Sequence, residues 1–292
     1  MTRVRRGLGL CACATILAVV LPAGAYASEL IGRNATAVRL QVDAQGRALV
    51  SFRSDGQSKH LLAWGAVDAR PPSQAVAQVA FELSYGGTLG ADTCRPYDGP
   101  PLAWLVKACT ASDGSHWALQ SWQRMLPNYG VTPNAKQAAW ELRLSHWRGP
   151  LPVLELWTDW SYRRFHHLYG RLTYREGGVF GFRSTRFGVP LDTYGRNVFV
   201  DTLGSTYGAG WKRENSFLTH QPTGAFCYGF YPHGPHPVGN GKRYRATVIG
   251  PGVTPDVMWE GPAPGAYDAT RDEAANAEQR RLLSGDARCK IN

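Results

Sequence analysis

The chain has 292 residues, with 32 Lys or Arg against 22 Asp or Glu, and a formal net charge of +10. It is rich in Gly (33 residues), Pro (19 residues) and aromatic side chains (11%), whereas charged residues make up only 18%. The apolar content excludes a disordered chain, and the Gly residues have no three-residue period, which excludes a collagen. The load of Gly, Pro and aromatic residues excludes a coiled coil.

The first 27 residues have the order of a secretory signal peptide. Three arginines precede an apolar run over residues 8–21, and Ala25 and Ala27 form a small-x-small cleavage site. The run is too short to span a bilayer, although an uncleaved anchor is the alternative interpretation. We therefore expect a secreted protein that is cleaved near Ala27 and has no transmembrane segment after cleavage.

Cleavage there would remove three arginines and no acidic residue, which leaves 29 basic against 22 acidic side chains and a net charge of +7. A moderate positive charge on an exported protein favours contact with anionic wall polymers or membrane surfaces, or it serves only solubility. Nucleic acid is not an expected partner, because the charge is modest and dispersed. The sequence does not indicate an oligomeric state.

Four cysteines follow the predicted signal peptide, and an even number in an exported chain indicates two disulfides. Of the three pairings we favour Cys94–Cys109, which closes a short loop, and Cys227–Cys289, which would attach the C-terminus to the body of the protein. A zinc site made of these thiolates is the alternative, but no two of them have the close spacing of zinc ligands.

Alternating apolar residues predict a β-hairpin early in the expected mature chain. Gly46 suits its turn, because Gly accepts a positive φ. The register that places six apolar side chains on one face pairs Val42 with Ala48, Leu40 with Val50 and Val38 with Phe52. Further strands are expected at 59–67, 77–85 and 138–147, and strands continue to about residue 250. Residues 127–134, with two Pro and a Gly, form the best boundary between two lobes.

The C-terminal region predicts a helix. Thr270 and Glu273 have the spacing of a capping box, and Gly285 would end the helix after about Ser284. Its apolar face is mostly alanine, so we expect it to lie on the surface. The fold class expected is all-β, with an antiparallel β-sandwich or jelly-roll-like core in one or two lobes and this short helix. The predicted divisions are an N-terminal β-meander lobe (28–127), a main sheet lobe (138–268), and the helix with a disulfide-tethered tail (269–292).

The segment 153–175 predicts the clearest hairpin and carries the candidate ligand-binding residues. We assume a five-residue loop from Ser161 to Phe165. One register then makes both faces of the hairpin consistent, with apolar side chains on one face and polar or aromatic side chains on the other. The pairs on the second face are Glu155 with Arg171, Trp157 with Tyr169, and Asp159 with His167.

This second face has two interpretations. As a ligand platform, the rings of Trp157 and Tyr169 would stack on sugar C–H faces while the charged groups bind hydroxyls or acids. As a structural face, it would be a solvated aromatic pair flanked by two salt bridges, which is the more ordinary arrangement. A glycosidase site is not indicated, because Glu155 and Asp159 lie about 13 Å apart along an extended strand, beyond the roughly 5–10 Å of catalytic carboxyl pairs.

Residues 192–240 concentrate polar and turn-forming residues. Trp211 and Lys212 in this region are further candidates for ligand binding. His220, His233 and His236 would suit a zinc ion with an open position for an activated water, but their spacing matches no zinc-protease motif. No other cofactor is predicted, and the G-x-S-x-G motif of serine hydrolases does not occur.

Three functions remain open, and the patterns define no family. The leading hypothesis is a bacterial cell-envelope protein that binds carbohydrate or an anionic polymer through the aromatic and charged face of 153–175. The second is a secreted hydrolase with its site in 192–240, with or without zinc. The third is a structural envelope protein without a ligand. A pocket between the two regions would favour chemistry, whereas an open face would favour polymer binding or no ligand at all.

Overall fold

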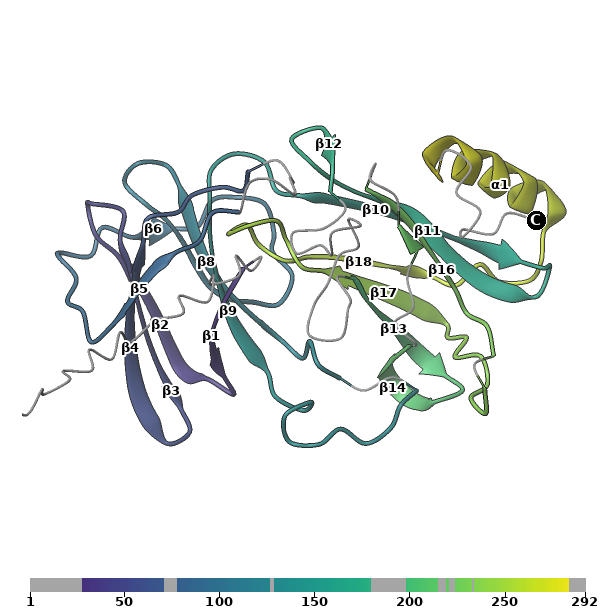
Figure 1. The fold of residues 1–292 in the computed structure, drawn as a ribbon, viewed down its shortest axis with the longest axis horizontal. Coiled ribbons are helices and arrows are strands. Elements are labelled where there is room, and N and C mark those ends of the chain that lie inside the picture. The colour runs from purple at the N-terminus through teal and green to yellow at the C-terminus, as the bar shows by residue number, and fades with distance from the viewer. Residues whose placement is uncertain are drawn as a thin grey trace, which may run out of the picture.

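Short strands rich in apolar and aromatic residues, joined by turns, form an antiparallel β protein. The computed structural model describes residues 28–70, 78–126, 129–179, 198–214, 219–220, 224–232 and 234–283. Within these ranges the backbone forms four antiparallel sheets and one helix, α1 (Ala269–Leu283), as Figure 1 shows. The predicted all-β, sandwich-like fold with a short C-terminal helix is therefore confirmed. The predicted signal peptide lies outside these ranges.

The first half of the chain forms one sandwich of two sheets, with strand orders β1-β9-β8-β7-β6 and β2-β3-β4-β5. The strands are β1 (Glu29–Arg33), β2 (Thr36–Val42), β3 (Ala48–Ser54), β4 (Gln57–Trp64), β5 (Glu82–Tyr85), β6 (Arg95–Pro96), β7 (Leu105–Thr110), β8 (His116–Trp122) and β9 (Glu141–Trp147). Their inward side chains form one buried cluster, which includes Ile31, Val50, Phe52, Trp117 and Leu144. Burial of a large apolar side chain contributes about 1.5–3 kcal/mol, so this core stabilises the sandwich.

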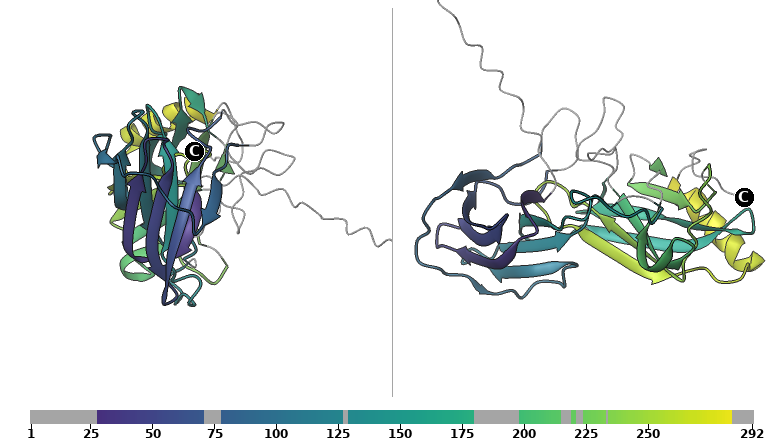
Figure 2. Two further views of the ribbon diagram at one scale, coloured as in Figure 1. Left: turned by 90° about the vertical axis from the view of Figure 1, so that its left-hand side faces the viewer. Right: turned by 90° about the horizontal axis from the view of Figure 1, so that it is seen from below.

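The second half forms another sandwich, with orders β10-β11-β16-β15 and β14-β13-β17-β18, and β12 pairs with β11. The strands are β10 (Val153–Ser161), β11 (Phe165–Tyr174), β12 (Gly177–Gly178), β13 (Val198–Ser205), β14 (Gly208–Arg213), β15 (Thr219–His220), β16 (Ala225–Gly229), β17 (Arg243–Val248) and β18 (Val257–Pro262). Its core includes Leu156, Leu168, Val200, Phe226 and Tyr244. The two sandwiches lie side by side along the long axis of the molecule (Figure 2).

Strand β9 shows where the chain passes from one sandwich to the other. We expected a second lobe from residue 138, but β9 lies between β8 and β1 in the first sandwich. The passage therefore falls at residues 148–152, between β9 and β10.

The β2–β3 hairpin follows the predicted register only near its turn. Val42 pairs with Ala48 and Leu40 pairs with Val50, as predicted. Val38 is not paired with Phe52, because the register shifts between residues 36 and 39. Ala37 lies in this shift with a φ of 52°. Such an irregularity depends on how the strand end packs, which periodicity does not reveal.

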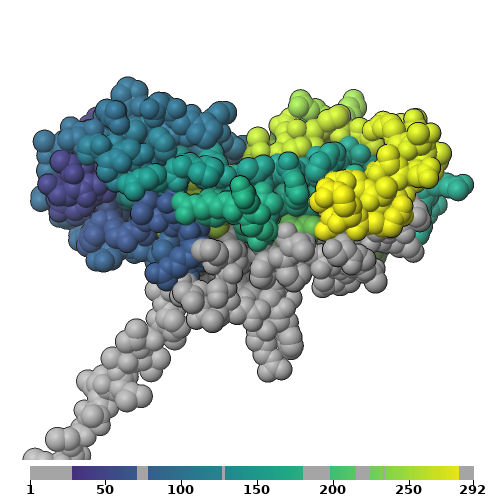
Figure 3. Space-filling model, turned by 90° about the horizontal axis from the view of Figure 1, so that it is seen from above, coloured from purple at the N-terminus to yellow at the C-terminus, as the bar shows by residue number. Residues whose placement is uncertain are grey.

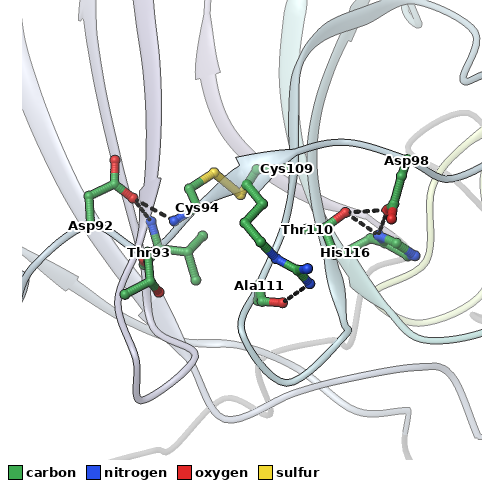
Figure 4. The surroundings of a disulfide bond; sticks show 10 residues. Asp92, Thr93, Cys94, Asp98, Cys109, Thr110, Ala111 and His116 are labelled. Atoms are coloured by element: carbon green, nitrogen blue, oxygen red, sulfur yellow. Dashed lines mark hydrogen bonds and ion pairs between the residues drawn. A yellow bond between two sulfur atoms is a disulfide. The ribbon is translucent and has the colours of Figure 1, made fainter.

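The predicted disulfide Cys94–Cys109 is confirmed, with the two Cα atoms 5.6 Å apart. It joins the residue before β6 to β7 at the edge of the first sandwich (Figure 4). Cys227 is also disulfide-bonded, and its predicted partner, Cys289, lies outside the described residues. No helix in the described part of the chain is long and apolar enough to cross a membrane.

A buried aspartate joins the two sandwiches. The Asp256 carboxylate accepts hydrogen bonds from the Ser28 hydroxyl at 2.8 Å, the Trp122 indole N–H at 2.7 Å and the Gly250 amide at 3.1 Å. The side chain of Gln120 also bonds both the backbone N–H and the carbonyl of Asp256, each at 2.9 Å. Because Asp256 precedes β18 while Ser28 and Trp122 belong to the first sandwich, these bonds fix one sandwich against the other.

We expect Asp256→Ala to lower the free energy of unfolding by about 3 kcal/mol or more, because three buried donors lose their acceptor at about 1–3 kcal/mol each. Asp256→Asn keeps an acceptor oxygen and should cost less. Urea denaturation followed by tryptophan fluorescence measures both. Glu273→Ala, on the exposed side of α1, is the control and should stay within about 0.5 kcal/mol. Unchanged stability of Asp256→Ala would contradict the linking role.

Candidate functional site

The β10–β11 hairpin has the register that the sequence predicts. Glu155 pairs with Arg171, Trp157 with Tyr169, and Asp159 with His167, and Ser161 pairs with Phe165 across the end of the hairpin. Leu156, Leu168 and Leu172 lie on the opposite face, in the core of the second sandwich. The candidate residues of 153–175 therefore share the outer face of one sheet.

Helix α1 covers half of this outer face, which the sequence did not indicate. Tyr169 is 3% exposed and packs with Leu282 of the helix. The Gln279 amide donates a 2.6 Å hydrogen bond to Asp159, which is 1% exposed. Asp159 also contacts the His167 ring nitrogen at 3.0 Å. Figure 3 shows α1 lying on the surface over the neighbouring strands. With α1 in place, these three platform residues do not reach a ligand.

The contact between α1 and the sheet is largely polar and incompletely satisfied. Ala275 and Leu282 supply its apolar part. The buried oxygens Asp272 Oδ1 and Gln279 Oε1 have no hydrogen-bond partner among the described residues. An orphaned buried acceptor costs about 1–3 kcal/mol, so the helix gains little stability from this face. The start of α1 also differs from the predicted capping box, because the Asp268 carboxylate accepts from the Arg271 amide at 3.0 Å.

The other half of the face is open. The Trp157 side chain is 38% exposed and stacks on Tyr169, with ring centroids 5.7 Å apart. Beside it Arg171 donates to Glu155 at 2.6 Å, and both of these side chains are about two-fifths exposed. The face therefore has two parts. One half is structural, because it supports α1, and the other half presents an indole and an ion pair to solvent. We call Glu155, Trp157 and Arg171 the exposed strip.

Trp211 and Lys212 do not join the exposed strip. They lie on β14, in the other sheet of the second sandwich. The Arg245 guanidinium lies over the rings of Trp211 and Trp104, 4.4 and 4.6 Å from their centroids. The Trp211 ring therefore already has a cation partner inside the protein.

The three histidines proposed for zinc are not brought together by any described contact. The side chain of His220 and the whole of His233 lie outside the described residues. The His236 ring stacks on Tyr129 at a centroid distance of 4.0 Å. In the part of the chain that the structure describes, no group of three or more His, Cys, Asp or Glu side chains could hold a metal ion.

A serine and a histidine meet in the first sandwich, but they do not form a triad. Ser115 Oγ lies 2.8 Å from His146 Nε2 and 2.6 Å from a carboxylate oxygen of Asp113. His146 Nδ1 bonds the Ala66 carbonyl instead of a carboxylate. Ser115 is fully buried, and burial lowers the pKa of His146 to about 4. The pair therefore lacks the carboxylate that orients and stabilises the histidine of a catalytic triad.

Glu214 is a buried acid in the 192–240 region that sequence reasoning did not single out. Its carboxylate accepts a 2.6 Å hydrogen bond from the Thr202 hydroxyl. Burial, with a smaller contribution from the nearby charge of Asp201, raises the pKa of Glu214 to about 7. His166 of β11 and Tyr244 of β17 are hydrogen-bonded to each other across the same sandwich. A carboxyl group with a pKa near neutrality can exchange protons at physiological pH, which general acid–base catalysis requires.

Comparisons with known proteins add nothing to this geometry, because no family model, no curated protein and no solved structure matches the chain.

The raised pKa of Glu214 makes stability depend on pH. Between pH 4.5 and 7 the folded carboxyl keeps a proton that the unfolded chain has lost, so the free energy of unfolding falls as pH rises through this window, by about 3 kcal/mol. We expect Glu214→Gln to remove this loss. The variant should match the parent at pH 4.5 and exceed its stability above pH 7.

Denaturation curves between pH 4 and 8 measure this effect, with Glu273→Gln on the exposed side of α1 as the matched control. A Glu214→Gln variant with the same pH dependence as the parent would show that the Glu214 carboxyl ionises normally in the folded protein.

Proposed function

We propose that this protein binds a carbohydrate or an anionic polymer of the cell envelope through the exposed strip. The observation that carries the proposal is the partly exposed Trp157 ring beside the Glu155–Arg171 ion pair. An indole face binds the C–H surface of a sugar, and a carboxylate with a guanidinium offers acceptors and donors for hydroxyl groups. Because the rings of Trp157 and Tyr169 are stacked, the Trp157 side chain is held in place before a ligand arrives.

Arginine also gives the strip an affinity for anions. The guanidinium of Arg171 bonds Glu155 through Nε, and the planar fork of a guanidinium can hold a second oxyanion through its remaining N–H groups. On α1, the hydrogen bond from Arg281 and, more weakly, the charge of Arg171 lower the pKa of Glu278. The strip is therefore bordered by fixed charges of both signs, which suits a polar polymer.

Export is part of this proposal, since the protein would have to leave the cytoplasm to bind a polymer of the cell envelope. The export signal predicted in residues 1–27 supports it. Mass measurement of the protein released by cells that express the full chain tests it, and a mature chain that starts at Ser28 is expected. Retention of the intact N-terminus would contradict cleavage near Ala27.

Hydrolysis is a second candidate function, favoured by Glu214. A buried carboxyl with a pKa of about 7 suits a general acid, and the His166–Tyr244 pair lies in the same sandwich. Release of reducing ends from a polysaccharide by the parent, and its loss in Glu214→Gln, would support this function. Equal turnover by the two proteins would remove Glu214 from it.

We expect Trp157→Ala to weaken retention on an immobilised polysaccharide by about 30-fold, because loss of a central aromatic anchor typically costs about 2 kcal/mol. Affinity electrophoresis in gels that contain a neutral glucan or polygalacturonate measures the retention. Trp140→Ala is the matched control, since Trp140 is 45% exposed and directly precedes β9 in the first sandwich.

Equal retention of Trp157→Ala and the parent would contradict binding through the strip. A parent that no polysaccharide retains would instead favour a structural envelope protein without a ligand.

A further inference from the structure

The turn at the end of the β10–β11 hairpin has side chains that its backbone disfavours. The Arg164 amide donates to the Ser161 carbonyl, and the two residues between them, Tyr162 and Arg163, have φ values of 52° and 59°. A turn with both central residues in the left-handed region favours Asn and Gly. Tyr and Arg there cost of the order of 1 kcal/mol each. The side chains at these positions therefore reduce the stability of the turn.

Three aromatic rings form the base of this turn. The rings of Tyr162, Phe165 and Tyr231 meet edge to face, with centroids 5.2 to 6.4 Å apart. The Ser161 hydroxyl and the Tyr231 hydroxyl are hydrogen-bonded at 2.6 Å. Tyr162 is nevertheless 44% exposed. Its ring is thus held by neighbours and still presents part of its surface to solvent.

The turn also carries two arginines. Arg163 and Arg164 are exposed, and neither forms an ion pair with any described residue. Arg164 lies over the Phe165 ring, 4.4 Å from its centroid. Arg163 acts on Asp272 only at a distance, and burial of Asp272 outweighs this effect and raises its pKa.

A second turn of the same kind provides a comparison. Between β11 and β12 the central residues Arg175 and Glu176 also have left-handed φ values, 48° and 66°. There, however, the guanidinium of Arg175 pairs with Asp68 at 2.7 Å. Strain alone therefore does not distinguish the β10–β11 turn. Its distinguishing feature is the combination of strain, an exposed aromatic ring and arginines that form no ion pair with the described residues.

We propose that the β10–β11 turn is a recognition site for the acidic groups of a polyanionic glycan. Arg163 and Arg164 would bind carboxylate, sulfate or phosphate oxygens, and Tyr162 would contact the adjacent sugar ring. A membrane surface is the less suitable partner, because the one apolar side chain of the turn, the Tyr162 ring, is packed against Phe165 and Tyr231 and leaves little area to bury in lipid. This inference rests on the proposed function, since it assigns negative charge to the polymer that the exposed strip would bind.

The exposed strip and the turn can contact one polymer. Trp157 lies four residues before Ser161, the last residue of β10, which is about 13 Å along the strand, and the turn follows directly. Both lie in the β10–β11 hairpin, and α1 covers the sheet face between them. A chain of several sugar rings that passes beside α1 would reach both.

Retention on polygalacturonate tests the proposal. We expect Arg163→Gln/Arg164→Gln to bind at least tenfold more weakly than the parent at low salt, and to lose most of the salt dependence of binding. The matched control is Arg39→Gln/Arg53→Gln, which removes two exposed arginines without ion pairs from the first sandwich and should retain binding. Equal losses in both double variants would show a general charge effect and overturn the assignment.

A second variant separates binding from stability. Tyr162→Asn/Arg163→Gly supplies the residues that the turn geometry favours, and this relief offsets the lost ring contacts of Tyr162, so we expect a thermal midpoint close to that of the parent together with weaker retention on polygalacturonate. The control Arg175→Asn/Glu176→Gly changes the comparison turn in the same way and should retain binding. A Tyr162→Asn/Arg163→Gly variant that binds as tightly as the parent overturns the proposal.

The remaining outcomes distinguish this inference from the proposed function. If Trp157→Ala alone reduces retention, the exposed strip binds the polymer and the turn assignment is wrong. If only the turn variants reduce retention, the turn binds polyanions and the strip does not. Binding of the parent to vesicles of anionic phospholipid without retention on polygalacturonate would overturn the glycan as the partner.

Discussion

Side-chain alternation in the β10–β11 hairpin is the constraint on which the second sandwich depends. It directs Leu156, Leu168 and Leu172 into the core, and in the same step it directs Tyr169 and Asp159 to the outer face. A slip of one residue would reverse every one of these positions, so burial of the leucines also determines which side chains are available for binding. The same register of the hairpin therefore sets both the core packing and the candidate site.

Helix α1 then divides that outer face. It seals Asp159 and Tyr169 with a buried hydrogen bond and one leucine, and it leaves the exposed strip at one end and the Tyr162–Arg164 turn at the other. Both ends are exposed to solvent. The strained turn, whose arginines form no ion pair within the described part of the chain, has reduced local stability, which is a common property of sites that bind other molecules.

Local patterns predicted much of this arrangement. The hairpin register follows from period-two alternation over twenty residues, and the short loop between Cys94 and Cys109 favours the disulfide that forms. Other features depend on distant segments. No local pattern indicates that β9 pairs with β1, or that the Arg245 guanidinium lies over the ring of Trp211. Each is decided by residues separated by about 30 positions or more in sequence.

The sequence by itself determined the β architecture, the faces of the hairpin and the residues that could bind a ligand, because side-chain period and turn chemistry are local. The tertiary structure decided which of those residues meet solvent. It placed α1 over Tyr169, buried Glu214 far enough to raise its pKa, and left Trp157 and Arg163 exposed. Exposure and electrostatic environment depend on what packs against a residue from elsewhere in the chain, and that is settled only when the sheets and the helix assemble.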